Sequence, residues 1–134
     1  MSMREMIAAH PDVRDDLNPA LAACIEETLA CARTCTACAD ACLAEGMVAE
    51  LRQCIRLNLD CADLCLAVSA VASRRTGGNV PVLRAVLDAC ALACRRCGEE
   101  CARHAGAHAH CRLCAEACTR CETACREALD SLPA

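Results

Sequence analysis

Seventeen cysteines and a cluster of three histidines are the residues of this 134-residue chain whose types and spacing could do chemistry. The cysteines fall into four groups, and successive cysteines within a group are 3, 4 or 7 residues apart. The groups are Cys24, Cys31, Cys35, Cys38 and Cys42; Cys54, Cys61 and Cys65; Cys90, Cys94, Cys97 and Cys101; and Cys111, Cys114, Cys118, Cys121 and Cys125. The histidines directly precede the last group, as His104, His108 and His110. Thiolates and imidazoles are metal ligands, so these residues are candidates for metal binding.

Two ordinary uses of cysteine fit this pattern poorly. A cysteine can act as a small buried hydrophobic residue, but 17 in register are far more than that role explains. Disulfides are disfavoured because the odd number leaves at least one thiol unpaired, and because two cysteines four residues apart on a helix have nearly parallel Cβ vectors. The N-terminal residues also lack the apolar stretch of a secretory signal, so we expect a cytoplasmic protein with reduced thiols.

The elements that must position these residues are helices. Steps of 3, 4 and 7 place each group along one helix face. Asn18-Pro19 is typical of a helix start, Glu45-Gly46 of a helix end and Thr76-Gly77-Gly78-Asn79 of a loop. The connections are short, which makes neighbouring helices antiparallel. We predict an all-α fold, an antiparallel up-down-up-down four-helix bundle with a Cys-lined core, as one domain over 1–134. Its helices cover 19–44, 47–73, 80–104 and 108–131, with room for a short helix before His10.

The two ends of the predicted bundle differ in composition. At the end that carries the first and third connections, the cysteine stripes continue as Met47 and the three histidines. At the other end they continue as a hydrophobic plug, made of Leu17, Leu21, Val68, Val71, Leu83, Val86, Leu87, Leu129 and Leu132. Thr28 and Asn58 fill gaps in the stripes, and we expect each to make a buried hydrogen bond to backbone or thiol. The sequence therefore predicts a tube of thiols with one histidine-bearing mouth.

Charge favours a monovalent soft ion in this tube. Zinc held by four thiolates leaves two excess negative charges per site, and the cysteine stripes carry no Lys or Arg to offset them. Burying unpaired charge is costly. One Cu(I) per thiolate replaces one proton and leaves no net charge, and soft thiolates select Cu(I). This argument predicts multiple Cu(I) ions, roughly one per cysteine.

The cysteine stripes on four helices, together with His104-Ala105-Gly106-Ala107-His108-Ala109-His110-Cys111, resemble the bacterial copper storage proteins over residues 18–131. The missing signal and the histidine-bearing mouth are similar to the cytosolic type of that family. The resemblance implies a cytoplasmic Cu(I) store that holds many ions on cysteine, loads through the histidines and forms a homotetramer. A copper chaperone is a candidate donor or acceptor.

Two other metal functions stay open at this point: a zinc or cadmium thiolate buffer and an Fe–S electron-transfer protein. An Fe–S cluster needs four cysteines that wrap one compact cluster, which cysteines along straight helices do not provide. A net charge of −4 and the lack of any aromatic residue argue against nucleic acid as a partner. No apolar run approaches the ~20 residues of a membrane span, and no catalytic constellation is visible, so we expect neither membrane insertion nor enzyme activity.

The second predicted helix also carries a second apolar stripe beside its cysteines. That stripe consists of Ile55, Leu59, Ala62 and Leu66, and Leu57 and Leu64 add further apolar surface. A helix that is apolar nearly all round is seldom left exposed to solvent. Because homo-oligomers usually close with two-fold axes, we expect this helix to pack against its own copy.

Overall fold

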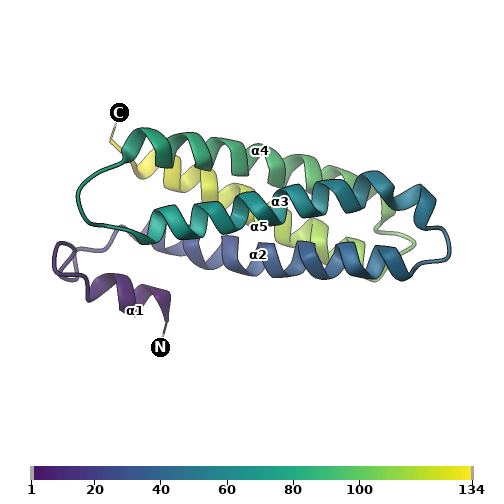
Figure 1. Ribbon diagram of the computed structural model, residues 1–134, viewed down its shortest axis with the longest axis horizontal. Helices are drawn as coiled ribbons and strands as arrows, with labels where there is room; N and C mark the ends of the chain where they lie inside the picture. Colours follow the sequence, from purple (N-terminus) through teal and green to yellow (C-terminus); the bar gives the residue numbers. More distant parts are fainter. Residues whose placement is uncertain (1, 134) are drawn as a thin grey trace.

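Four long helices run side by side in the computed structural model, which describes residues 2–133 (Figure 1). They are α2 (Pro19–Ala44), α3 (Arg52–Ser73), α4 (Val80–His104) and α5 (Ala109–Ser131). Each packs against the helices before and after it, and α5 closes the bundle against α2. Within 2–133 no residue lies in a β-strand. The predicted all-α antiparallel bundle is confirmed.

Local sequence signals set most of the helix boundaries. The Asn18 side chain accepts a hydrogen bond from the backbone N–H of Leu21 at 3.1 Å, which caps α2 directly before Pro19. Glu45 has an extended backbone and ends α2 where the sequence predicts it. Gly77, in the predicted loop between α3 and α4, has a φ of 68°, a left-handed conformation that glycine adopts without strain.

Two boundaries differ from the prediction. The helix predicted over 47–73 begins instead as a short 3-10 helix, η1 (Val48–Leu51), and becomes α3 only at Arg52. The connection after α2 is very short, and a 3-10 turn, with its i→i+3 bonds, is a tighter way to begin the return. The helix predicted from residue 108 begins one residue later, because His108 has an extended backbone and precedes the first turn of α5.

The predicted hydrophobic plug lies at the end opposite η1. Leu21, Val68 and Leu87 are fully buried there. Leu17, Leu83, Val86, Leu129 and Leu132 are partly buried and pack against the core. Val71 is an exception, since it is half-buried and lines a hollow between the α3–α4 loop and the C-terminal residues.

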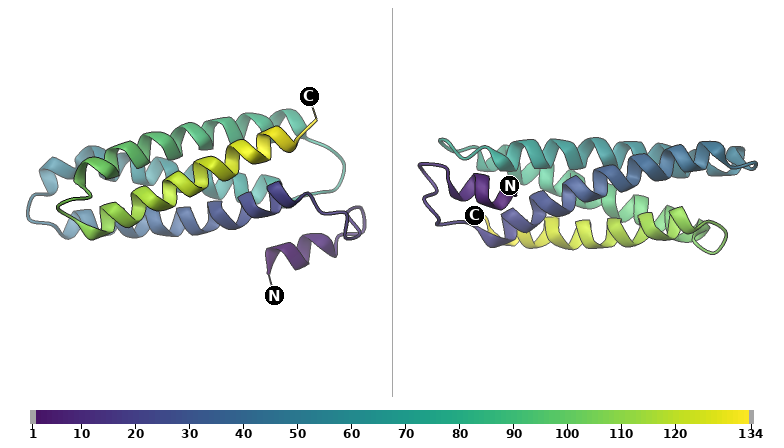
Figure 2. Two further views of the ribbon diagram at one scale, coloured as in Figure 1. Left: turned by 180° about the vertical axis from the view of Figure 1, so that it is seen from behind. Right: turned by 90° about the horizontal axis from the view of Figure 1, so that it is seen from below.

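A short N-terminal helix, α1 (Met3–Ala8), lies outside the bundle and packs against α2 (Figure 2). Ile7 and Val13 are buried by this segment. The Nε2 of His10 lies 3.0 Å from the Oγ1 of Thr76 in the α3–α4 loop, so His10 sits at the plug end, away from the other histidines. None of the helices within residues 2–133 is both long enough and apolar enough to cross a bilayer.

Candidate metal centre

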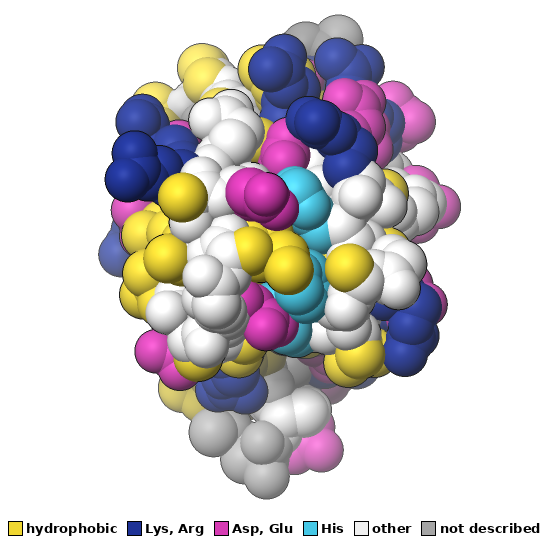
Figure 3. Space-filling model, turned by 90° about the vertical axis from the view of Figure 1, so that its right-hand side faces the viewer, with side chains coloured by type: hydrophobic (Ala, Val, Ile, Leu, Met, Phe, Trp, Pro, Cys, Tyr) yellow, Lys and Arg dark blue, Asp and Glu magenta, His cyan; other side chains and the backbone are white. Residues whose placement is uncertain are grey.

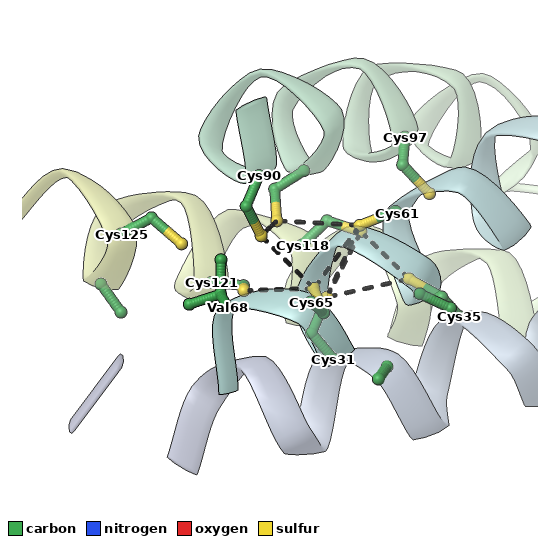
Figure 4. Packing of buried hydrophobic residues seen from close by; sticks show 14 of the residues in the cluster. Cys31, Cys35, Cys61, Cys65, Val68, Cys90, Cys97, Cys118, Cys121 and Cys125 are labelled. Carbon is green, nitrogen blue, oxygen red and sulfur yellow. Dashed lines mark hydrogen bonds between the residues drawn. The ribbon is translucent and has the colours of Figure 1, made fainter. Parts of the chain in front are cut away.

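All 17 cysteine side chains are buried between the four long helices, and every one is a free thiol. Figure 4 shows that thiols from different helices point toward one another, with a chain of contacts running between them. Contacts between helices include Cys54–Cys101 at 3.5 Å, and Cys61–Cys94 and Cys24–Cys125 at 3.7 Å between sulfurs. The helical spacing therefore produces the sulfur-lined core that the sequence predicts.

The thiols form overlapping groups rather than separate sites. In each group the sulfurs all lie within 4.8 Å of one another. The groups include Cys31, Cys65, Cys94 and Cys121; Cys31, Cys35, Cys61 and Cys118; Cys35, Cys97, Cys114 and Cys118; Cys38, Cys42, Cys54 and Cys111; and Cys38, Cys101 and Cys114. Five cysteines, which are Cys31, Cys35, Cys38, Cys114 and Cys118, belong to two of these groups each. Ions in neighbouring groups would therefore have to share sulfurs.

The sulfur spacing suits metal–thiolate bonding in general. A metal–sulfur bond of about 2.3 Å separates two sulfurs by about 3.8 Å in a tetrahedral site, by about 4.0 Å in a trigonal one and by about 4.6 Å in a linear one. The closest sulfur pairs lie between 3.5 Å and 4.0 Å apart. Small side-chain movements would therefore admit an ion between neighbouring thiols.

The thiols nearest the mouth differ in acidity. A hydrogen bond with Cys101 lowers the pKa of Cys38 to about 5; Cys54 and His110 act in the same direction, and Cys114 and burial oppose them. Burial raises the pKa of Cys42 to about 11, and the neighbouring Cys38 adds to that shift. Cys38 is therefore ready to bind a metal as a thiolate at neutral pH, whereas Cys42 keeps its proton until a metal displaces it.

Asn58 is the central polar residue of the core, and it is fully buried. Its Oδ1 accepts hydrogen bonds from the thiols of Cys97, Cys101 and Cys114 at 3.0, 3.4 and 3.2 Å. Its Nδ2 donates to Cys54 at 3.8 Å. The predicted buried hydrogen bond to thiol is confirmed at this position.

Thr28, the other polar residue that fills a gap in the stripes, is also fully buried. Its hydroxyl donates to the backbone carbonyls of Cys24 at 2.8 Å and Ile25 at 3.0 Å. This backbone hydrogen bond confirms the prediction for Thr28. Both gap residues thus satisfy their polar atoms inside the core, which a buried polar group requires.

The three clustered histidines lie at the η1 end of the bundle, where their side chains form a band flanked by acidic and hydrophobic side chains (Figure 3). His110 is the one that reaches the core, since its Nδ1 lies 3.4 Å from the sulfur of Cys38 and 3.6 Å from that of Cys111. Burial lowers the pKa of His110, but hydrogen bonds with Cys38 and Glu45 outweigh it and the net shift is upward. His110 therefore connects the surface to the thiols.

Two glutamates hold the mouth histidines, and the sequence analysis missed both. Glu45 Oε2 lies 3.0 Å from His108 Nδ1 and 2.9 Å from His110 Nε2. Glu100 is buried and its Oε2 lies 2.8 Å from His104 Nε2. The spacing of Glu100 and His104, four residues apart on one helix, is a signal that could have revealed the second pair. Glu45 gives no such signal, because its partners lie more than 60 residues away.

Met47, the methionine expected at the mouth, lies at this end directly before η1 and is 47 % exposed. Leu43 and Leu113, near the end of α2 and the start of α5, are also more than half exposed. Exposed apolar side chains thus lie at the same end of the bundle as the mouth histidines.

A closed helical bundle whose core is lined throughout by free thiols defines a thiolate-based metal-storage protein rather than a single-site metalloprotein. Residues 17–130 match the copper storage protein family, Csp. The chain belongs to this family.

Solved structures support the assignment. The copper storage protein Ccsp from Streptomyces lividans, loaded with 10 copper equivalents, is 54 % identical with a TM-score of 0.91, covering 98 % of this chain and 100 % of that one. A structure described as a cytosolic copper storage protein from the same organism, with five coppers, is 62 % identical with a TM-score of 0.84, covering 85 % and 95 %. A Ccsp variant with two histidines replaced by alanine is 61 % identical with a TM-score of 0.83, covering 84 % and 95 %. No curated protein sequence matches the chain.

Proposed function

We propose that this protein stores Cu(I) in the cytoplasm, with many ions bound by cysteine thiolates inside the bundle and loaded through the histidine-bearing mouth. The overlap of the thiol groups is the observation that carries the proposal. The proposed ligands are Cys24, Cys31, Cys35, Cys38, Cys42, Cys54, Cys61, Cys65, Cys90, Cys94, Cys97, Cys101, Cys111, Cys114, Cys118, Cys121 and Cys125, with His104, His108 and His110 at the mouth. The function requires no catalytic step.

Sulfur sharing favours ions that accept bridging thiolates, and charge then favours Cu(I) over zinc. Because five cysteines each belong to two groups, the groups cannot all be filled by tetrahedral ions with four private thiolates. Soft, low-coordinate Cu(I) accepts bridging thiolates, and one ion per thiolate keeps the core neutral. The cytoplasmic location is supported by the description of the relative that is 62 % identical as a cytosolic copper storage protein.

Loading is proposed to begin at the mouth and to proceed inward. His110 faces both the surface and the thiols of Cys38 and Cys111. The exposed apolar side chains of Leu43, Met47 and Leu113 at this end of the bundle offer a surface on which a copper chaperone could dock as donor or acceptor. An ion would pass from imidazole to the thiolates, which hold Cu(I) more strongly.

A homotetramer formed through α3 completes the proposal. Leu59 and Leu66 on this helix are 45 % and 52 % exposed, as a subunit interface requires. Ala62, from the same predicted stripe, is buried inside the chain, and Ile55 is partly buried against the core. The stripe is thus divided between the bundle core and the proposed interface.

A metal competition tests the proposal. Reduced protein is incubated anaerobically with equal amounts of Cu(I) and Zn²⁺, and native mass spectrometry counts the bound ions. We expect copper alone, with species carrying well over four ions. A dominant species with about four zinc ions would overturn the copper assignment in favour of the zinc buffer. A brown protein containing iron and sulfide would support the Fe–S alternative.

A further inference from the structure

Glu45 lies at a position where one carboxylate contacts two histidines. It is the first residue after α2, and its Oε2 lies 3.0 Å from Nδ1 of His108 and 2.9 Å from Nε2 of His110. We infer that Glu45 is a positioning residue for copper loading, which holds the two neutral imidazoles in opposite tautomers. This inference rests on the proposed loading through the mouth.

The tautomers follow from the chemistry of the three groups. A carboxylate only accepts hydrogen bonds, and a neutral imidazole carries one N–H. The nitrogen that faces Glu45 must therefore carry the hydrogen, which is Nδ1 in His108 and Nε2 in His110. The nitrogens left without hydrogen are Nε2 of His108 and Nδ1 of His110.

The bare nitrogen of His110 points at the core. Its Nδ1 lies 3.4 Å from the sulfur of Cys38 and 3.6 Å from that of Cys111, and the thiol of Cys111 can donate a hydrogen bond to it. A metal binds imidazole through the nitrogen that carries no hydrogen. The carboxylate thus presents the metal-binding nitrogen of His110 to the first thiols of the tube.

The carboxylate of Glu45 also orients His108, whose ring lies beside that of His110. The two rings stack with their centroids 5.4 Å apart and an angle of 18° between their planes. One carboxylate thus holds two stacked imidazoles at the mouth. Carboxylates hydrogen-bonded to metal-binding histidines also raise the basicity of the ligand nitrogen.

The pair of His104 and Glu100 provides a contrast at the same end of the bundle. Glu100 holds only one histidine, and its second oxygen, Oε1, accepts a hydrogen bond from Arg103 at 3.1 Å. Glu45 instead connects the end of α2 to the start of α5 through two histidines. Glu45 therefore fixes the orientation of two proposed metal ligands, His108 and His110, at once.

The first test needs no copper. Long-range ¹H–¹⁵N spectra of the imidazoles are recorded on the full-length apo protein, two pH units above the histidine pKa measured in the same sample. We expect Nδ1–H for His108 and Nε2–H for His110, and loss of the Nδ1–H form of His108 in Glu45→Ala. Glu100→Ala is the matched control and should change the signals of His104 alone. The same tautomer in both His108 and His110 of the unmodified protein would overturn the inference.

The second test measures loading. Stopped-flow uptake of Cu(I) from a chelate should slow about tenfold in Glu45→Ala, at unchanged final capacity. Glu50→Ala removes the same charge from exposed η1 and should keep the original rate. Glu45→Gln retains an acceptor oxygen and should recover most of the loss. If Glu45→Gln is as slow as Glu45→Ala, the carboxylate acts by charge attraction and the positioning role is refuted.

The two proposals fail in different ways. If His108→Ala and His110→Ala both load at the original rate, loading through the mouth is wrong. If these variants are slow but Glu45→Ala is fast, loading through the mouth stands and the role of Glu45 is wrong.

Discussion

Replacing Leu87 by alanine should separate the stability of the bundle from its capacity for copper. Leu87 is fully buried in the plug, on the same helix as four of the thiols. Truncation of a buried leucine to alanine costs 2–5 kcal/mol of unfolding free energy, through lost apolar burial and the cavity left behind. For a side chain with no exposure we expect about 3 kcal/mol.

That loss converts to a change in melting temperature. A chain of this length has an unfolding entropy of about 0.28 kcal/mol/K, so Leu87→Ala should lower the Tm of the apo protein by about 10 °C. Scanning calorimetry at one fixed protein concentration measures it, because association would make Tm depend on concentration. The number of Cu(I) ions bound should stay the same, since no thiol is removed.

The matched control is Leu92→Ala, on the same helix but 51 % exposed, which should change the unfolding free energy by less than about 0.5 kcal/mol. Equal Tm values for the two variants would contradict the packing argument. A loss of copper capacity in folded Leu87→Ala would contradict the separation of plug and metal core.

Three further predictions concern folding, acidity and assembly. Circular dichroism should show the same high helix content with and without copper, because the apo core is already packed; an apo chain that folds only on metal addition would contradict this. As pH falls through about 5, thiolate absorbance should decrease in one step, when Cys38 takes up its proton, and Cys38→Ser should show no such step. The same step in Cys38→Ser would refute the assignment to Cys38. Light scattering should give a tetramer for the unmodified protein and a smaller species for Leu59→Glu, whereas a monomeric 14.1 kDa unmodified chain would refute the α3 interface.

The fold was predictable because one residue type marks the buried face of each of the four long helices. Cysteine steps of 3, 4 and 7 define the helix period without help from the rest of the composition. Asn18-Pro19 and Glu45-Gly46 then fix the two ends of α2, since capping depends on local hydrogen bonds that the sequence itself encodes. The 3-10 start at η1 was not predictable in this way, because it depends on how a three-residue connection reverses the chain.

The mouth was predictable in composition and not in geometry. The sequence identifies three histidines near the last cysteine group, but it does not show which of them reaches the thiols. In the structure His110 is the histidine that reaches Cys38, a residue 72 positions away. Glu45 was interpreted only as a helix end. Contacts between residues so distant in the chain follow from how the helices pack, which periodicity does not specify.

The copper capacity of the thiol core is measured by an anaerobic titration of the fully reduced protein with Cu(I). The titration is followed by the thiolate–copper absorbance and by competition with a chromogenic chelator. We expect Cu(I) to be withdrawn from the chelator until roughly 17 ions are bound per chain, because one ion per thiolate keeps the buried core neutral. Saturation near four ions per chain, with most thiols still free, would contradict it.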